Sequence, residues 1–438
     1  MRSPFRSPIW QNNAFVRVVA ASSTSVLGSM ITNLAIPFVA ILVLDAGPLE
    51  VSILRGLELG TALLVGLIAG AWVDRLRRRP VLIWADLGRA AVLVTIPIAF
   101  VLGVLSIWQL IVVAVLTSVL TTFFDAADNA YLPTVVKREE LVEANSALTA
   151  AGSVAEFTGF GIAGFLIGAL TAPIAIVFDA LTFVVSAVLL GGIRREEGVP
   201  PPRSARESVR REIAEGLHLV RSDPILRAFV GARMMHHVLW GIFGGTWLLF
   251  TTRELGLDPA AIGVVAAVGG LASFSGAIVT SRSTRRWGIG RVAIGAMVVL
   301  AIGNASMAGA PAGLPLIALG FLLFQQLVGD SAAMVYDITE TTTRQTMVAD
   351  RHQGRVASTF HVAGVAAQLA ATLGAGLLAE VIGLRLTIAL APIGGLLGAA
   401  ILWYSPVRTL VALPKPPDVE AAVDEARAED IRTEPFGG

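Results

Sequence analysis

Residues 70–80 read Gly-Ala-Trp-Val-Asp-Arg-Leu-Arg-Arg-Arg-Pro, a charge-dense segment between two long apolar runs. The run before it covers residues 51–72 and the run after it covers residues 81–105. Each run is long enough to cross a bilayer as a helix, which takes about 20 residues. The segment therefore predicts a short cationic turn that joins two neighbouring membrane helices on one side of the membrane.

The composition of the chain is that of an integral membrane protein. Of the 438 residues, 55% are hydrophobic and 15% are charged, and the mean hydropathy is +0.74. The chain has no cysteine, which excludes disulfides, thiolate metal sites and cysteine nucleophiles. The apolar run after the polar residues 1–13 is too long for the core of a cleavable signal peptide, so the first span is expected to stay.

Hydropathy predicts about twelve membrane-spanning helices, six in each half of the chain. The expected spans are 15–44, 51–72, 81–105, 108–124, 145–170 and 174–193, then 225–252, 260–281, 290–308, 314–336, 356–382 and 384–404. We therefore expect an all-α membrane protein made of two pseudo-symmetric six-helix bundles.

A polar segment separates the two sets of spans. It is rich in Arg, Glu and Pro and predicts a solvated linker that carries a short amphipathic helix from Glu207 to Val220. The expected division is a first bundle (1–193), the linker (194–223), a second bundle (224–404) and a cytoplasmic tail (405–438). The acidic, alanine-rich end of the tail is expected to be disordered or loosely helical.

Basic residues concentrate in alternate loops and predict the orientation. These loops contain Arg77, Lys137, Arg194, Arg285 and Arg351, each next to or near a second basic residue. The loops between them are poor in Lys and Arg. By the positive-inside rule the basic loops and both termini are expected to be cytoplasmic.

The two halves of the sequence resemble each other. Residues 151–156 (Ala-Gly-Ser-Val-Ala-Glu) align with residues 363–368 (Ala-Gly-Val-Ala-Ala-Gln), and Asp125 and Tyr131 align with Asp330 and Tyr336. The alternative is that glycine- and alanine-rich helices look alike by composition alone. A duplication predicts a parallel repeat with a substrate site between the halves near the midplane.

The segment at residues 70–80 carries a family motif. Gly70, Asp74, Arg75, Arg78 and Arg79 resemble the Gly-x-x-x-Asp-Arg-x-x-Arg-Arg loop between helices two and three of the major facilitator superfamily. The resemblance implies that superfamily's fold and a loop that acts as a cytoplasmic latch in the outward-open state. For the motif alone, an ordinary positive-inside loop is the alternative.

Further stretches of the first half resemble one branch of that superfamily. They are Asp86 and Arg89, residues 130–133 (Ala-Tyr-Leu-Pro), 141–145 (Leu-Val-Glu-Ala-Asn) and 178–183 (Phe-Asp-Ala-Leu-Thr-Phe). They look like the branch of bacterial siderophore and macrolide exporters. The fourth helix lacks Arg-x-x-Gln-Gly and the fifth lacks Gly-Pro-x-x-Gly-Gly, so the mechanism of drug/proton antiporters does not transfer directly.

Ionisable side chains inside a bilayer are costly and are therefore functional candidates. Glu156 lies near the middle of the fifth span among small residues, where we expect a desolvated carboxyl that binds a proton or a cationic substrate. A packing role, with the carboxyl satisfied by a neighbouring Ser or Thr, is the alternative. Asp179 on the sixth span is a further candidate, although a packing role through a hydrogen bond to Thr182 is favoured for it.

Two sets of charged residues are candidates for gates. Arg55 and Glu58, three residues apart on the second span, would share one helix face and neutralise each other, and we expect them to form part of an extracellular gate. A cytoplasmic gate is expected from the motif together with carboxylates near it. Its members are Gly70, Asp74, Arg75, Arg78, Arg79, Asp86, Arg89, Asp125 and Asp128.

The second half adds polar candidates for the cavity. His236 and His237 lie at mid-depth of the seventh span, and only one can face a cavity because adjacent helical residues point about 100° apart. Such a His can titrate during a cycle, or it can serve as an interhelical hydrogen-bonding group. Without a third ligand the pair makes no metal site. Further cavity candidates are Trp240, Asn33, Gln325, Gln326 and Gln368.

These features predict a secondary active transporter driven by the proton gradient, without a cofactor. No nucleotide-binding loop, Ser-His-Asp arrangement or metal cluster is evident, so an enzyme is not expected. We expect efflux of an amphipathic small molecule, such as a drug or siderophore, by a monomer in the bacterial plasma membrane, with the lipid bilayer but no nucleic acid as partner. The alternatives are an importer or facilitator of a small metabolite or lipid-like substrate, and a membrane-embedded sensor or scaffold.

Overall fold

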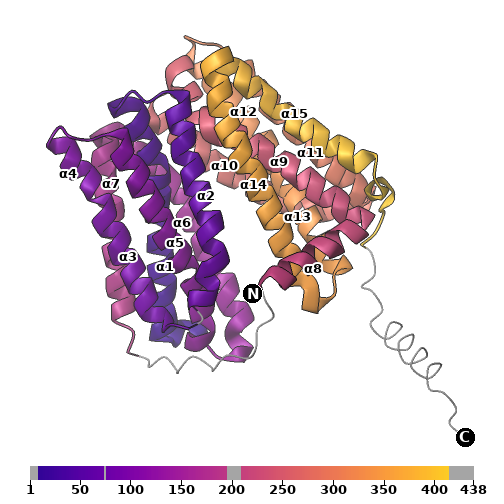
Figure 1. Ribbon diagram of the computed structural model, residues 1–438, viewed down its shortest axis with the longest axis horizontal. Coiled ribbons are helices and arrows are strands. Elements are labelled where there is room, and N and C mark those ends of the chain that lie inside the picture. The colour runs from indigo at the N-terminus through magenta and orange to yellow at the C-terminus, as the bar shows by residue number, and fades with distance from the viewer. Residues whose placement is uncertain (1–7, 74, 195–208, 414–438) are drawn as a thin grey trace, which may run out of the picture.

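The computed structural model describes residues 8–73, 75–194 and 209–413. Within these ranges the chain is helical and contains no strand. The helices form two bundles that lie side by side and diverge toward one end (Figure 1). We call this the linker end, because residues 194 and 209, the described residues on either side of the gap in the predicted linker, lie there, and we call the opposite end the far end.

The first bundle is formed by α1 to α7. Residues 8–11 form a short 3₁₀ turn before α1, and residues 138–140 form another before α6. The elements are α1 (Asn13–Phe38), the π-helical turn η3 (Val39–Val43), α2 (Pro48–Val73), α3 (Arg78–Leu93), α4 (Thr95–Val101), α5 (Ile107–Val135), α6 (Leu141–Leu170) and α7 (Ala172–Gly191).

The second bundle is formed by α9 to α15, with α8 (Val209–Ser222) before it. Its elements are α9 (Pro224–Leu249), the π-helical turn η5 (Phe250–Glu254), α10 (Pro259–Trp287), α11 (Ile289–Ala308), α12 (Pro315–Gln325), the π-helical turn η6 (Gln326–Asp330), α13 (Ser331–Met347), α14 (Asp350–Ile382), α15 (Leu384–Trp403) and the 3₁₀ turn η7 (Pro406–Thr409).

The helices account for the expected membrane spans. Ten candidate spans in the described residues meet the length and hydropathy that a membrane helix needs. The helices α2 and α9, with 26 residues each, complete the set of twelve. Both are about 39 Å long at 1.5 Å per residue, enough to cross a bilayer. The prediction of an all-α membrane protein with twelve spans is confirmed.

Local sequence signals explain where several helices begin. The side chain of Asn12 caps α1 by accepting from the amides of Ala14 and Phe15, and Ser106 caps α5 in the same way. Asp223 and Asp258 cap α9 and α10, and each is followed by a proline at the first helical position, where the missing amide proton costs no hydrogen bond.

Backbone conformation shows that the two bundles are repeats. Of seven described residues with positive φ, six form three pairs, Asp45 with Gly256, Gly103 with Gly313 and Thr171 with Gly383, whose members are 211, 210 and 212 residues apart. The π-helical turns η3 and η5 also begin 211 residues apart. Composition alone does not place rare backbone conformations at one constant spacing, so the structure supports duplication.

The fourth and tenth spans are longer than hydropathy predicts. The prediction ends them at Phe124 and Tyr336, whereas α5 continues to Val135 and α13 continues to Met347. The added turns carry Asp128 and Glu340, which are polar but have partners inside the protein. Polar residues therefore ended the predicted spans too early.

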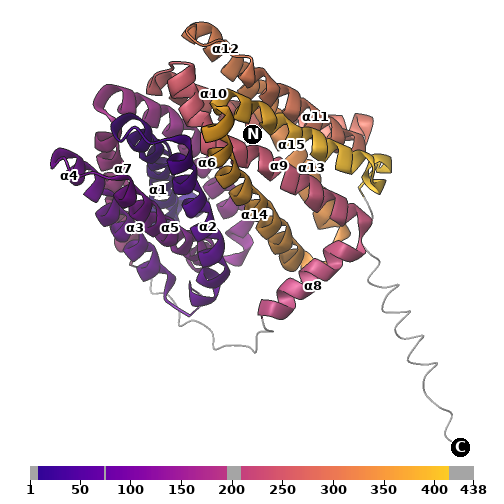
Figure 2. The same cartoon turned by 45° about the horizontal axis from the view of Figure 1, so that its top comes forward.

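The linker and tail also have ordered parts. The amphipathic helix predicted from Glu207 to Val220 corresponds to α8, which lies across the linker end of the second bundle beside α14 (Figure 2). Its Glu215 forms an ion pair with Arg355 of α14. The tail does not begin at residue 405 as predicted, because Val407 is fully buried and Leu410 accepts a hydrogen bond from the amide of Gly290. Residues 195–208 and 414–438 lie outside the described residues.

The two bundles meet in their far-end halves. Helix α2 packs on α14, and α6 packs on α10. A Cβ atom added to Gly164 of α6 would lie only 2.6 Å from Cα of Gly263 of α10, so the two glycines let the backbones touch. Ser52 of α2 donates to the carbonyl of Gly245 of α9 at 3.3 Å. These contacts close the far end between the bundles.

Candidate functional site

A cavity of about 1310 Å³ lies between the two bundles and is lined by residues of both. The acidic side chains in its lining are Glu58, Asp125, Glu156 and Asp330, whereas Arg55 is the one arginine among the described lining residues. Its aromatic lining consists of Phe157, Phe160, Phe183, Trp240, Phe243, Trp247 and Phe274. The cavity thus combines an excess of carboxylates with aromatic walls.

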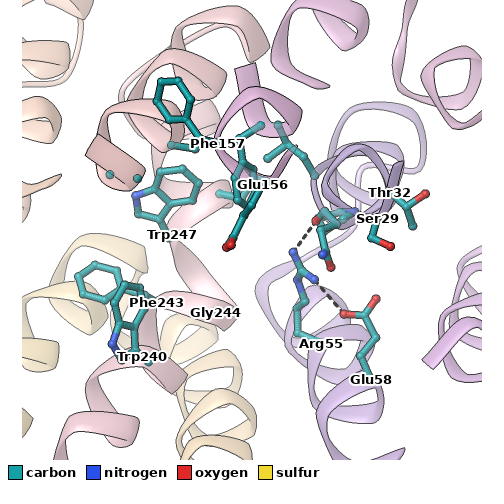
Figure 3. Close-up of a pocket in the computed structure, with 18 of the residues that line it drawn as sticks. Ser29, Thr32, Arg55, Glu58, Glu156, Phe157, Trp240, Phe243, Gly244 and Trp247 are labelled. Carbon is teal, nitrogen blue, oxygen red and sulfur yellow. Dashed lines mark hydrogen bonds and ion pairs between the residues drawn. The ribbon is translucent and has the colours of Figure 1, made fainter. Parts of the chain in front are cut away.

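Glu156 lies on α6 and is exposed to this cavity. Its side chain points into the space between Arg55 of the first bundle and Trp247 of the second (Figure 3). The desolvated environment that we expected for this carboxyl is therefore not what the structure shows. The small residues around Glu156 leave it open to the cavity instead of covering it.

Arg55 and Glu58 form the ion pair that their spacing predicts. Nη1 of Arg55 lies 2.9 Å from Oε2 of Glu58, and Nη2 donates to the carbonyl of Asn33 at 2.6 Å. All three residues line the cavity on the first-bundle side. The pair does not bridge the two bundles.

A different ion pair bridges the bundles at the far end. Nη2 of Arg253, in η5, lies 2.6 Å from Oδ1 of Asp45, which follows η3. Close to it, Oε1 of Glu380 accepts a hydrogen bond from the amide of Leu49 at the start of α2, at 3.3 Å. This pair was not predicted from the sequence. The available signal is one acidic and one basic residue at nearly equivalent positions of the two repeats.

Asp179 lies outside the cavity and is fully buried in the first bundle. It accepts hydrogen bonds from Thr32 and, at 3.2 Å, from Thr182. Gly28 of α1 provides the space, because a Cβ atom there would lie 2.2 Å from Oδ1 of Asp179. The geometry matches the packing alternative for this residue.

Asp86 and Arg89 form a buried ion pair within the first bundle. The Arg89 guanidinium lies between two aromatic rings, 4.4 Å from the centroid of Phe124 and 4.1 Å from that of Phe183. It also donates to Ser25 at 3.1 Å. Asp86 is therefore paired with a residue of its own helix.

The remaining residues expected in the cytoplasmic gate are dispersed. Asp128 accepts a hydrogen bond from Ser22 at 2.9 Å, and Asp125 is exposed to the cavity. Arg79 donates to the carbonyl of Leu190 at 2.9 Å, at the end of α7.

The rest of the motif lies at the end of α2 and the start of α3. Gly70 has no atom within 4 Å of the position a Cβ would take. Arg75 is exposed and Arg78 is partly buried. Asp74 lies outside the described residues.

The two histidines do not line the cavity themselves. Each forms a hydrogen bond with a residue that does. Nε2 of His236 accepts a hydrogen bond from the indole of Trp240 at 3.0 Å. Nδ1 of His237 lies 2.9 Å from Oε1 of Gln368. Trp240 and Gln368 line the cavity, whereas neither histidine does. No group of three metal-ligating side chains occurs in the part of the chain that the structure describes.

The polar residues of the tenth span line the cavity on the side of the second bundle. They lie where α12 ends and the π-helical turn η6 begins. Gln325 donates to Asn304 at 3.3 Å, and Gln326 donates to the carbonyl of Val265 at 3.1 Å. Asp330 ends the turn, and its Oδ1 is buried without a hydrogen-bond partner.

A second buried ionic cluster lies toward the linker end of the second bundle and was not predicted. Glu340 is fully buried and lies 2.7 Å from Arg233 of α9 and 2.9 Å from Arg344 of its own helix. It is the counterpart of Asp128, since each carboxylate lies seven residues before the last residue of its helix. Glu340 and Arg344 have the four-residue spacing of helical ion pairs, which is the signal that could have identified them.

Comparison with known proteins gives the family. A model of the Major Facilitator Superfamily matches residues 18–349. The multidrug efflux pump Tap of Mycolicibacterium fortuitum is 30% identical over 422 residues, which cover 91% of this chain and 97% of that protein. YfiS of Bacillus subtilis (strain 168), described as an uncharacterized MFS-type transporter, is 25% identical over 385 residues, which cover 86% and 90% of the two chains.

Solved structures share the fold. The nucleoside transporter NupG has a TM-score of 0.75 at 10% identity, over 89% of this chain and 99% of that one. A bacterial homologue of the iron transporter ferroportin, in an inward-facing state, has a TM-score of 0.71 at 18% identity, over 89% and 98%. The names of these relatives are those of transporters and not of enzymes. With two repeated bundles around a central cavity and a family match over most of its length, the chain belongs to the Major Facilitator Superfamily.

Proposed function

We propose that this transporter exports amphipathic organic cations in exchange for protons. The observation that carries the proposal is the lining of the cavity, where four carboxylates accompany one arginine and seven aromatic rings. A cavity of this kind attracts positive charge through its carboxylates and apolar surface through its rings. An anion would meet no free cation among the described lining residues.

The charge of the cavity is concentrated on residues other than the Arg55–Glu58 pair. Because Arg55 and Glu58 neutralise each other at 2.9 Å, Asp125, Glu156 and Asp330 are the carboxylates left for a ligand. Glu156 is the most accessible site for recognition, since it is exposed and projects between the two bundles (Figure 3). We propose that its carboxylate binds the cationic group of the substrate.

The aromatic residues fit the apolar part of such a substrate. Trp240, Phe243 and Trp247 of α9 face Glu156 across the cavity (Figure 3). A cation near their ring faces gains about 0.5–2 kcal/mol from each favourable contact. Because Trp240 is held by His236 and Gln368 by His237, this wall is oriented before the substrate arrives.

The conformation suits loading from the linker end. By the positive-inside rule this end is cytoplasmic, and the bundles are closed at the far end by the Asp45–Arg253 pair and the glycine contacts of α6 and α10. Export then requires these far-end contacts to part while the linker end closes. Both halves of the cavity come from one chain, so we propose the monomer in the plasma membrane as the transporting unit.

Relatives support export more than import. Tap is named a multidrug efflux pump and aligns along nearly the full length of this chain. NupG is named a nucleoside transporter but shares only 10% identity. Nucleosides lack the positive charge that the acidic lining selects, which makes uptake of such a metabolite the weaker alternative.

A flux measurement tests the proposal. Full-length protein is reconstituted in proteoliposomes, and movement of tetraphenylphosphonium is followed after a pH gradient is imposed. The variant Glu156→Gln removes the charge and keeps the shape. Its matched control is Glu143→Gln, on the same helix but exposed and outside the cavity.

The expected result is gradient-driven movement of the cation by the wild type and by Glu143→Gln. For Glu156→Gln we expect the rate to fall at least about tenfold, the effect of losing roughly 1.4 kcal/mol of interaction. Full gradient-driven transport by Glu156→Gln would contradict the role of this residue, and absence of cation movement in the wild type would contradict the substrate class.

A further inference from the structure

Asp330 is the cavity carboxylate with no compensating partner. It is 9% exposed, its Oδ1 has no hydrogen-bond partner, and none of the ion pairs among the described residues includes it. The other cavity carboxylates differ from it, because Glu58 is paired with Arg55 and Glu156 and Asp125 are exposed.

The backbone around Asp330 is arranged to place this carboxyl at the cavity wall. Asp330 is the last residue of the π-helical turn η6, and single π turns inside α-helices frequently occur at functional sites. Gly269 of α10 provides the space, since a Cβ atom there would lie 2.6 Å from Oδ2 of Asp330 and 2.3 Å from Nε2 of Gln326. A larger residue at position 269 would displace the carboxyl.

The elements that pack on η6 place no basic side chain in an ion pair with Asp330 among the described residues. These elements are α10, α11, α12 and α13. Their charged and titratable side chains are Arg282, Arg285 and Arg286 of α10, Arg291 of α11, and Tyr336, Asp337, Glu340 and Arg344 of α13. Glu340 and Arg344 are paired with each other. The other charged side chains that line the cavity are Asp125, Glu156 and the paired Arg55 and Glu58, so the lining offers Asp330 no unpaired positive charge among the described residues.

An ionised carboxylate in this position has two ways to be neutralised, by a proton or by a cationic ligand. We infer that Asp330 holds a proton while the cavity is empty and releases it when the cationic group of a substrate binds beside it. This inference rests on the proposed cation substrate and assigns the exchange of proton for cation to Asp330, whereas Glu156 contributes to binding the cation.

In this step water in the cavity accepts the proton that Asp330 releases. The O–H bond of the Asp330 carboxyl breaks and its electron pair remains on the carboxylate oxygen. The proton passes to water in the cavity, and the positive charge of the substrate takes its place. The net charge at this wall is unchanged, which lets the substrate enter without leaving a buried charge unpaired.

Proton release on ligand binding tests the inference. Purified full-length protein in weakly buffered detergent is mixed with tetraphenylphosphonium, bound cation is measured by equilibrium dialysis, and released protons are measured with a pH indicator. The test variant is Asp330→Asn. The matched control is Asp337→Asn, the same substitution two helical turns further along the same helix and outside the cavity lining.

We expect the wild type and Asp337→Asn to release about one proton for each cation bound, and Asp330→Asn to lose this release while still binding. Glu156→Gln is expected to bind the cation more weakly with an unchanged ratio of protons to bound cation. An unchanged ratio in Asp330→Asn would overturn the inference and leave the proposed function standing.

Infrared spectroscopy of the empty protein provides a readout that does not depend on the substrate. We expect a carbonyl band of a protonated carboxylic acid in the wild type that is missing in Asp330→Asn and restored by Asp330→Glu. The same spectrum in wild type and Asp330→Asn would overturn the inference. If the band is present but the wild type binds no tetraphenylphosphonium, then the proposed substrate class fails and the protonated Asp330 remains.

Discussion

Oδ1 of Asp45 and Nη2 of Arg253 lie 2.6 Å apart, although the two residues are 208 positions apart in the chain and belong to different bundles. Asp45 follows the π-helical turn η3 and Arg253 lies within the π-helical turn η5, each at the end of the first helix of its bundle. The repeat therefore places one acidic and one basic residue opposite each other at the far end. The pair can exist only while the far end is closed.

Removing this pair is expected to favour opening of the far end. Because Asp45 is largely exposed, the ion pair contributes about 0–1 kcal/mol. We expect Asp45→Asn and Arg253→Gln each to raise the labelling rate of Leu248→Cys by an impermeant maleimide up to about fivefold. The measurement is clean because the chain has no native cysteine.

The double variant serves as the control for this prediction. If the two side chains act through each other, Asp45→Asn with Arg253→Gln labels no faster than the faster single variant. Additive effects of the two substitutions would show that they act independently and that the pair does not hold the far end.

The contact between Gly164 and Gly263 predicts a loss of transport without a loss of fold. A side chain at Gly164 would approach the backbone of Gly263 to 2.6 Å, so Gly164→Val is expected to prevent far-end closure. We expect the variant to be produced in the membrane at a normal level and its transport rate to fall at least about tenfold, since the closed conformation would lose well over 1.4 kcal/mol.

Gly161→Val is the matched control, because the position of its added Cβ has no atom within 4 Å. It lies one helical turn earlier on the same helix. Equal transport by Gly164→Val and Gly161→Val would argue against a cycle that needs this far-end contact.

The buried pair of Asp86 and Arg89 predicts a large effect on stability. Removing one partner of a buried ion pair costs about 3–5 kcal/mol, and Arg89→Ala also removes the contacts with Phe124 and Phe183. We expect a strongly lowered melting temperature in detergent. The paired apolar replacement, Asp86→Leu with Arg89→Met, is expected to recover part of the loss, and a wild-type melting temperature for Arg89→Ala would contradict this assignment.

Thr171 predicts a stabilising substitution. It adopts φ +109° and ψ +153°, a region that β-branched residues rarely occupy, and its counterpart in the second bundle is Gly383 with φ +84°. Relief of such strain is worth about 1–3 kcal/mol, so Thr171→Gly is expected to raise the melting temperature. The reciprocal change, Gly383→Thr, is expected to lower it, and opposite shifts would remove the argument from backbone strain.

The fold could be predicted from the sequence because hydropathy is a property of local segments. The predicted spans correspond to the helices, since burial in lipid requires a continuous apolar run wherever a helix crosses. The ends of α5 and α13 were placed too early because Asp128 and Glu340 are polar. Their partners, Ser22 and Arg233, lie on other helices and leave no local signal.

The candidate site was predictable in part. Glu156, Arg55 and Glu58 could be predicted as site residues because charged residues are rare inside a membrane. All three line the cavity. Whether a carboxyl is covered or open depends on neighbouring helices, which explains why the expected desolvation of Glu156 was wrong and why Asp330 was not put forward as a proton site. The Asp45–Arg253 pair depends on how two loops meet and could not be predicted from either loop alone.

The most direct measurement of the central claim compares two ligands of nearly the same size and opposite charge. Binding of tetraphenylphosphonium and tetraphenylborate to the purified full-length protein in nonionic detergent is measured by equilibrium dialysis. An acidic, aromatic cavity predicts at least tenfold tighter binding of the cation, and a reduced preference in Glu156→Gln. Equal binding of the two ions by the wild type would contradict the account.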